Sequence, residues 1–182
     1  MSRRAALALA AFALALPASG LASRQAYTPG PHNIPFPAGF ERHFIRYATV
    51  DKPDRRIVRF LYVNPEAFAA ARPGEPLPYG TILVMADRWA KLDPAGTPLR
   101  DLDGRLIPEP EPFVVAVQRK ERGWGEGYPP ERRNGAWEYA SFTPAGEPRA
   151  VRLDGCFSCH LQARAAEDYT FVFWDYLRGR GR

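Results

Sequence analysis

The two cysteines of this chain, Cys156 and Cys159, are separated by only two residues. A disulfide between them could not join distant segments, so a disulfide scaffold is excluded and a hydrophobic core must stabilise the fold. The chain has 182 residues, of which 46% are hydrophobic, and a chain of this size can bury such a core in one domain. Its 19 prolines and 15 glycines indicate many stiff connections and argue against a bundle of long helices.

The N-terminal segment has the pattern of a secretory signal peptide. Two arginines near the start precede an apolar run from Ala5 to Leu16, and small residues follow. This run is too short to span a bilayer core of about 30 Å, and a buried or uncleaved helix is the alternative. We therefore expect residues 1–22 to be a signal peptide and the mature protein to be periplasmic or otherwise exported, with no membrane span after processing. Residues 23–39, rich in proline, are predicted to form an N-terminal extension.

The formal net charge of +5 is not concentrated in a basic stripe. Three of the 25 basic residues are lysines and the other 22 are arginines, interspersed with 20 acidic residues. This distribution argues against a nucleic-acid-binding surface. It indicates a solvated basic surface, or one that docks an acidic partner such as a redox protein.

Five segments have the alternation or the apolar run that is typical of β-strands: 43–50, 56–63, 81–89, 113–118 and 136–142. Most of their connections are short, which favours antiparallel pairing of neighbours. The longest connection, 93–112, is rich in Pro, Gly and Asp and indicates a loop or hairpin.

Two short helices are expected between and after these strands. Asn64 and Pro65 mark the N-cap and the first position of a helix over Glu66–Arg72. A second helix is expected from Cys156 to Glu167. We therefore predict one α+β domain over residues 40–182, a mainly antiparallel β-sheet with a few short helices.

The second of these helices begins with the sequence Cys-x-x-Cys-His, in which His160 directly follows Cys159. On a helix, Cys156 and His160 are four residues apart and lie on the same side. Two thiols at this spacing can form thioethers with the two vinyl groups of one porphyrin, and the histidine can then bind the iron as its proximal ligand. The motif predicts one covalently attached haem c per chain, held by a C-terminal haem-binding helix through Cys156, Cys159 and His160.

Three other uses of the cysteines fit the sequence less well. A redox-active disulfide of the thioredoxin type needs a βαβ arrangement, and only 22 residues follow His160. A zinc site needs two more ligands, for which only His32, His43 and acidic residues remain. A structural disulfide between Cys156 and Cys159 would leave the histidine without a role.

The ligand on the other side of the iron would decide between electron transfer and the binding of a small molecule. Met85 is the only methionine after the signal segment, and it lies in an apolar strand where core packing is its simplest role. Of the remaining imidazoles, His32 lies in the proline-rich extension and His43 lies next to charged residues near a strand start, so an exposed or hydrogen-bonded role is simpler for each. By elimination we expect five-coordinate iron with an open distal side. The alternative is a simple electron-transfer cytochrome with His160 and Met85 as axial ligands.

Several stretches of the chain are similar to cytochrome P460 and its relative cytochrome c′-beta. They are Arg59–Pro65, Tyr79–Val84 and Gly135–Phe142, followed by the Cys-x-x-Cys-His motif and Asp168–Phe171. Their order and spacing, with the motif close to the C-terminal end, are more specific than any single stretch. The chain resembles this family over about residues 40–175.

The resemblance implies a mainly antiparallel β fold, a periplasmic homodimer and one haem whose five-coordinate iron has the motif histidine as proximal ligand. Proteins of the P460 type oxidise hydroxylamine and bind nitric oxide, and the c′-beta relatives bind nitric oxide and carbon monoxide. An enzyme of this type would pass electrons from hydroxylamine or nitric oxide to a partner cytochrome. A binding protein would sense, store or scavenge nitric oxide.

One difference from the P460 pattern concerns a lysine that is cross-linked to the haem edge in that family. Counted from Gly80 and Thr81, its position is occupied by Met85, and Lys91 lies six residues further along. A thioether has no amine with which to form the bond. The resemblance therefore implies gas binding of the c′-beta type more than hydroxylamine oxidation, with Met85 close to the haem.

Three further residues are candidates for the surroundings of the iron. Arg59 could bind a haem propionate or direct a donor into the pocket, and Glu138 could accept a proton in a hydroxylamine-type oxidation, so both are candidate catalytic residues. Phe60, on the opposite face of its strand from Arg59, could cap a hydrophobic distal pocket. For each, an ordinary strand or core role is the alternative. Four rings are expected in the core or against the haem: Trp137, Tyr139, Phe171 and Phe173.

Overall fold

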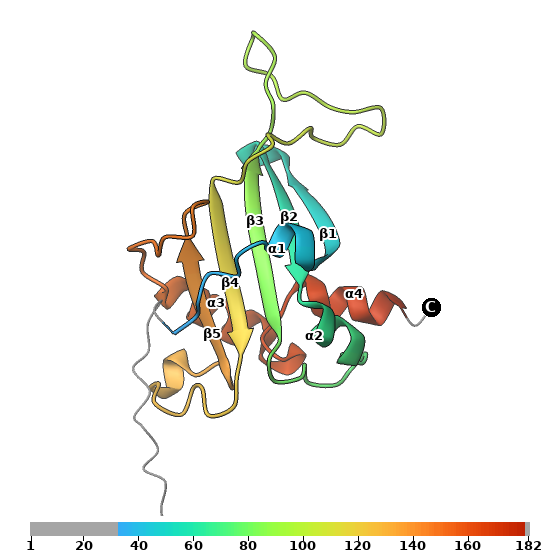
Figure 1. The fold of residues 1–182 in the computed structure, drawn as a ribbon. Helices are drawn as coiled ribbons and strands as arrows, with labels where there is room; N and C mark the ends of the chain where they lie inside the picture. The colour runs from blue at the N-terminus through green and yellow to red at the C-terminus, as the bar shows by residue number, and fades with distance from the viewer. Residues whose placement is uncertain (1–32, 181–182) are drawn as a thin grey trace, which may run out of the picture.

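A five-stranded antiparallel sheet forms the centre of the molecule, in a computed structural model that describes residues 33–180 (Figure 1). The strands are β1 (Ile45–Lys52), β2 (Ile57–Val63), β3 (Ile82–Trp89), β4 (Val114–Lys120) and β5 (Trp137–Phe142), and each pairs with the next along the chain. The predicted α+β fold with a mainly antiparallel sheet is confirmed. The predicted signal peptide and His32 lie outside the described residues.

Side chains alternate between the two faces of the sheet, and different parts of the chain cover each face. On one face, Tyr62, Val84 and Val117 lie opposite one another on β2, β3 and β4. Ile34 and the short helix α1 (Phe40–His43) pack against them, so we call this the N-terminal face. Sequence periodicity did not predict α1, because four residues make only one turn.

The opposite face, called the C-terminal face, is covered by helices near the end of the chain (Figure 1). They are α3 (Asp154–Arg164) and α4 (Val172–Arg180), joined through the 3₁₀ helix η3 (Ala165–Glu167). The helix predicted over 156–167 is observed as α3 followed by η3. Trp137 of β5 and Phe173 of α4 are fully buried in the core between sheet and helix. Among the described residues, no helix is long and apolar enough to cross a membrane.

The helix predicted after β2 is α2 (Pro65–Ala70), with Asn64 at its N-cap position. The Asn64 side chain does not cap the helix as expected. Its Oδ1 accepts a hydrogen bond from the backbone N–H of Ile82 at 2.8 Å, and its Nδ2 donates to the Gly80 carbonyl at 3.2 Å. Asn64 is buried, so its amide satisfies backbone groups at the start of β3 that would otherwise be left without partners.

The long connection between β3 and β4, residues 90–113, forms an arm that projects from one end of the sheet (Figure 1). Isolated bridges such as Leu92–Pro98 and Arg100–Leu106 run along it, in agreement with the predicted loop or hairpin. Arg105 fastens the arm to β1 through two hydrogen bonds of 2.9 Å to the Asp51 carboxylate. The guanidinium of Arg105 lowers the pKa of Asp51, which keeps the pair ionised.

Candidate haem-attachment site

Helix α3 holds both cysteines and His160 on the C-terminal face. Phe157, which lies between the two cysteines, is buried and fixes the helix to the sheet. Its ring centroid lies 5.0 Å from that of Tyr128 and 4.8 Å from that of Tyr139. Cys156 is half-buried and Cys159 is exposed, and both are free thiols. The buried anchor therefore leaves the two sulfur atoms available for a covalent attachment.

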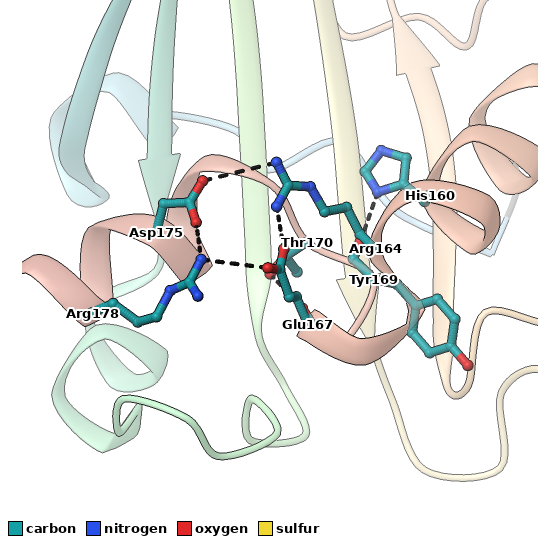
Figure 2. A network of polar contacts seen from close by, with 7 residues as sticks. All are labelled: His160, Arg164, Glu167, Tyr169, Thr170, Asp175 and Arg178. Carbon is teal, nitrogen blue, oxygen red and sulfur yellow. Dashed lines mark hydrogen bonds and ion pairs between the residues drawn. The ribbon is translucent and has the colours of Figure 1, made fainter.

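The imidazole of His160 is held from one side by a backbone carbonyl. Its Nδ1 lies 2.6 Å from the Tyr169 carbonyl oxygen, as Figure 2 shows. A carbonyl can only accept, so Nδ1 carries the proton and the Nε2 lone pair is left for another partner. Within residues 33–180, Nε2 has no hydrogen-bond partner. Burial lowers the pKa of His160, partly offset by the Tyr169 carbonyl, and this favours the neutral ring that binds metals.

Two rings hold the imidazole in place. The centroid of Tyr139 lies 4.8 Å from that of His160, and Phe171 meets the imidazole edge-on at 4.8 Å and 87°. The guanidinium of Arg164 covers the Phe171 ring at 4.7 Å. Of the four rings considered from the sequence, Tyr139 and Phe171 therefore contact His160, whereas Trp137 and Phe173 lie in the core.

A set of ion pairs fixes the turn that joins α3 to α4 (Figure 2). Arg164 pairs with Glu167 and lies 3.9 Å from Asp175, and Arg178 pairs with both carboxylates. These groups are partly exposed, so each pair contributes less than about 1 kcal/mol. Together they join the end of α3 to α4 on either side of the turn that carries Tyr169.

The Tyr169 carbonyl depends on an unusual backbone. Asp168 and Tyr169 are consecutive non-glycine residues with positive φ, 48° and 57°. The Asp168 carboxylate accepts from Lys120 Nζ at 2.8 Å and from the Leu77 backbone N–H at 2.7 Å, and Lys120 also donates to the Leu77 carbonyl at 2.7 Å. The buried amide of Gln118 donates to the Tyr169 carbonyl at 2.9 Å. The sheet thus holds the turn that faces His160.

Met85 and Arg59 lie on the same face of the sheet as these groups. Met85 of β3 is opposite Ala116 of β4, and these two residues form one cross-strand row on this face. Gln118, two residues after Ala116, belongs to the next row. Adjacent rows on one face are about 7 Å apart along a strand. Arg59 makes a two-pronged ion pair with the buried Asp87, at 2.7 and 2.8 Å. Met85, Ala116 and Arg59 are half-buried, so the helices leave part of this face uncovered.

The structure places Phe60 and Glu138 on the N-terminal face, away from His160. The guanidinium groups of Arg46 and Arg88 both lie over the Phe60 ring, 4.5 and 4.4 Å from its centroid. Glu138 directly precedes Tyr139 on β5, so its side chain points to the opposite face. His43 is exposed at the end of α1, which packs against that same N-terminal face. Phe60, Glu138 and His43 thus lie on the other side of the sheet from His160 and the two cysteines.

Glu138 is nevertheless an unusual carboxyl group. It is 1% exposed, and among the described residues neither of its oxygens has a hydrogen-bond partner. Burial raises its pKa to about 8. In the folded protein this side chain is therefore neutral at pH values where an exposed glutamate is ionised.

Replacing Glu138 by glutamine is expected to flatten the pH dependence of stability. Between about pH 4.5 and 8 the unfolded chain has lost this proton and the folded chain still binds it, so the wild-type free energy of unfolding falls as pH rises. The contribution of this group approaches about 1.4 kcal/mol per pH unit. Urea denaturation at pH 5, 6.5 and 8 measures it. Glu111→Gln, at an exposed position of the arm, is the control, and parallel curves for Glu138→Gln and wild type would contradict the expectation.

A comparison of the sequence with models of known protein families identifies the family of this chain. The sequence model of the family Cytochrome P460 matches residues 37–172, from just before α1 to the first residue of α4. The chain belongs to the cytochrome P460 family. The resemblance inferred from the sequence is thus confirmed. The comparison with curated proteins gives no match.

Membership of the cytochrome P460 family implies a haem, and the described residues fit one. Two free thiols and an imidazole with an unengaged Nε2 lie within one helix turn of each other on α3. The partly uncovered row around Met85 lies on the same face. Among the described residues, no group of three or more His, Cys, Asp or Glu side chains is placed to hold a metal ion by itself.

The sequence did not reveal the residues that hold His160. Gln118 is a polar residue at the end of an apolar strand, and Lys120 follows at the next position on the same face. The two-residue spacing of Gln118 and Lys120 indicates that their side chains share one face of the strand. No other local pattern indicates that this face is the one covered by the helices. Nothing in the sequence indicates that Tyr169 would act through its carbonyl instead of its ring. Asp87, the carboxylate that pairs with Arg59, was also missed.

Proposed function

We propose that this member of the cytochrome P460 family is an exported, periplasmic c-type cytochrome with one haem that binds nitric oxide at an open iron. The observation that carries the proposal is the arrangement of His160. Its Nδ1 is engaged by the Tyr169 carbonyl, its Nε2 is unengaged, and two free thiols lie on the same helix. This is the combination required of a proximal ligand next to a covalent attachment point.

Three residues of α3 would hold the haem, two through sulfur and one through nitrogen. Cys156 and Cys159 would each hold the haem through a thioether, in which the S–H bond adds across one vinyl C=C bond, so that no oxidant is needed. His160 would bind the iron through Nε2, while its Nδ1 keeps its proton and donates it in a hydrogen bond to the Tyr169 carbonyl. Haem supplies, when bound, an iron that can bind a small nitrogen ligand and exchange an electron. The contacts of His160 with Tyr139 and Phe171 keep the imidazole in one orientation.

Arg59 and Met85 are the proposed residues on the sheet side of the haem. The ion pair with Asp87 holds the Arg59 guanidinium in a fixed position, from which it can donate to a propionate or to a bound ligand. Met85 offers an apolar, adaptable side chain. Both are half-buried on the C-terminal face.

The positions of the three lysines support ligand binding over hydroxylamine oxidation. Lys91 is exposed in the arm, and Lys52 ends β1, the edge strand. Lys120 lies on the C-terminal face, but its Nζ is occupied by Asp168 and the Leu77 carbonyl. None of them lies in the same cross-strand row as Met85, the position at which the lysine cross-linked to the haem is expected from the P460 pattern. The proposal extends to a homodimer and to an enzymatic activity. In that form the protein is an oxidoreductase that acts on nitric oxide or hydroxylamine and passes the electrons to a partner cytochrome.

A simple electron carrier is the second candidate, and the position of Met85 favours it. Met85 lies on the same face as His160, one row from Gln118, where a sulfur ligand could approach the iron from the sheet. Ligation by histidine and methionine fills both axial positions and suits electron transfer. The two candidates differ in the coordination of the reduced iron.

Absorption and resonance Raman spectra of the reduced holoprotein, with and without nitric oxide, test the proposal. We expect five-coordinate, high-spin ferrous iron, a large spectral change on adding nitric oxide, and the same behaviour in Met85→Leu. A six-coordinate, low-spin spectrum that Met85→Leu converts to high spin would establish the electron carrier instead. A broad, red-shifted ferrous Soret band would reveal a cross-linked haem and restore hydroxylamine oxidation.

A further inference from the structure

The Tyr169 carbonyl oxygen accepts two hydrogen bonds from different parts of the fold. One comes from His160 Nδ1 on α3 at 2.6 Å, and the other from Gln118 Nε2 on β4 at 2.9 Å. Gln118 is buried, and its Nε2 is also 3.4 Å from the Tyr139 hydroxyl. The buried Gln118 amide and the His160 imidazole therefore share one acceptor. Gln118 can thus change the strength of the hydrogen bond between His160 and the Tyr169 carbonyl.

The position of the carbonyl is imposed by the sheet. Each left-handed non-glycine residue costs about 1–2 kcal/mol, so the successive φ values of Asp168 and Tyr169 persist only because their surroundings hold them. Lys120 supplies the ion pair to Asp168, in which both side chains are about nine-tenths buried. Gln118 and Lys120 are two residues apart on β4 and therefore share its face. One strand thus holds both the strained turn and its carbonyl.

We propose that Gln118 and Lys120 are positioning residues that set how strongly His160 donates to Tyr169, and through it the reduction potential of the haem iron. Lys120, through Asp168, aims the carbonyl at Nδ1. Gln118 shares the carbonyl and weakens its hydrogen bond with the imidazole. The inference rests on the proposed role of His160 as proximal ligand.

The sign of the effect follows from charge. A stronger hydrogen bond from Nδ1 gives the imidazole more anionic character, makes it a better donor and stabilises ferric over ferrous iron. Removing the amide of Gln118 leaves the carbonyl to the imidazole alone. The potential should therefore become more negative and the iron–histidine stretching frequency should rise. If Gln118 only filled space, an apolar side chain of similar length would change neither.

The test measures both properties in Gln118→Met holoprotein. We expect the one-electron reduction equilibrium to shift toward the ferric form by about tenfold, which is about 59 mV, together with a higher iron–histidine stretching frequency. Gln118→Asn, whose amide is one methylene shorter, should shift both in the same direction and serves if Gln118→Met does not fold. An unchanged potential and frequency, or a shift toward the ferrous form, would overturn the inference.

Asn134 provides a matched control. It is also a buried amide, and it donates to the Tyr139 hydroxyl at 2.8 Å and to the Phe157 carbonyl at 3.0 Å, but not to Tyr169. Asn134→Leu should lower the melting temperature and shift the potential by much less than Gln118→Met; an equal shift in potential would show that the effect is not specific to the Tyr169 carbonyl. A wild-type protein without histidine-ligated haem would instead refute the proposed function, so the two failures are distinguishable.

Discussion

Replacing Cys156 and Cys159 together by alanine is expected to abolish covalent haem attachment. Both thiols are free, and the thioethers proposed for them are the bonds that would survive denaturation. After denaturing electrophoresis, wild-type chain should retain haem, detected by its peroxidase activity, and the double variant should retain none. The pyridine haemochrome spectrum of each single variant should shift toward that of a haem with one remaining vinyl group.

Ser158→Ala is the control for this experiment, because Ser158 lies between the cysteines and supplies neither a thiol nor an iron ligand. It should retain the wild-type amount of haem. Haem that stays bound to the double variant after denaturation would exclude the cysteines as attachment points.

Replacing Lys120 by methionine is expected to lower the free energy of unfolding by about 3–5 kcal/mol. The substitution leaves the Asp168 carboxylate buried beside the Leu77 N–H without its counter-charge. It also removes the hydrogen bond that Lys120 donates to the Leu77 carbonyl. Urea denaturation of the holoprotein at neutral pH measures the loss.

Lys91→Met makes the same chemical change at an exposed position of the arm and should alter stability by less than about 0.5 kcal/mol. The double variant Lys120→Met/Asp168→Asn removes the unpaired charge and should recover part of the loss. Similar losses for Lys120→Met and Lys91→Met would show that the buried pair does not stabilise the fold.

Local patterns were sufficient to predict the sheet and the attachment motif. Alternation placed the strands close to their observed bounds, and the Cys-x-x-Cys-His spacing depends only on one helix turn. Alternation also predicts that Arg59 and Phe60, or Glu138 and Tyr139, point to opposite faces. Alternation does not indicate which face of the sheet α3 covers, because that depends on contacts between the sheet and helices that follow it in the chain.

The surroundings of His160 depend on contacts that no local pattern contains. The Tyr169 carbonyl faces the imidazole because two residues adopt positive φ, and neither is a glycine. The groups that hold this turn come from β4, about 50 residues earlier in the chain. Helix α4 was missed for a related reason: its rings resemble those of a strand, and burial of Phe173 and Leu177 against the sheet makes the segment helical.

Strand order also bears on how the chain assembles. Every strand pairs with the one before it, so the sheet forms through contacts between neighbours in sequence, which favours rapid folding. β4 and β5 precede α3 in the chain, so the surface that receives His160 can form without the cysteine segment. We expect haem attachment to act on a terminal segment that is still accessible. The docking of α4 and of the turn before it against the sheet would then be the final step of folding.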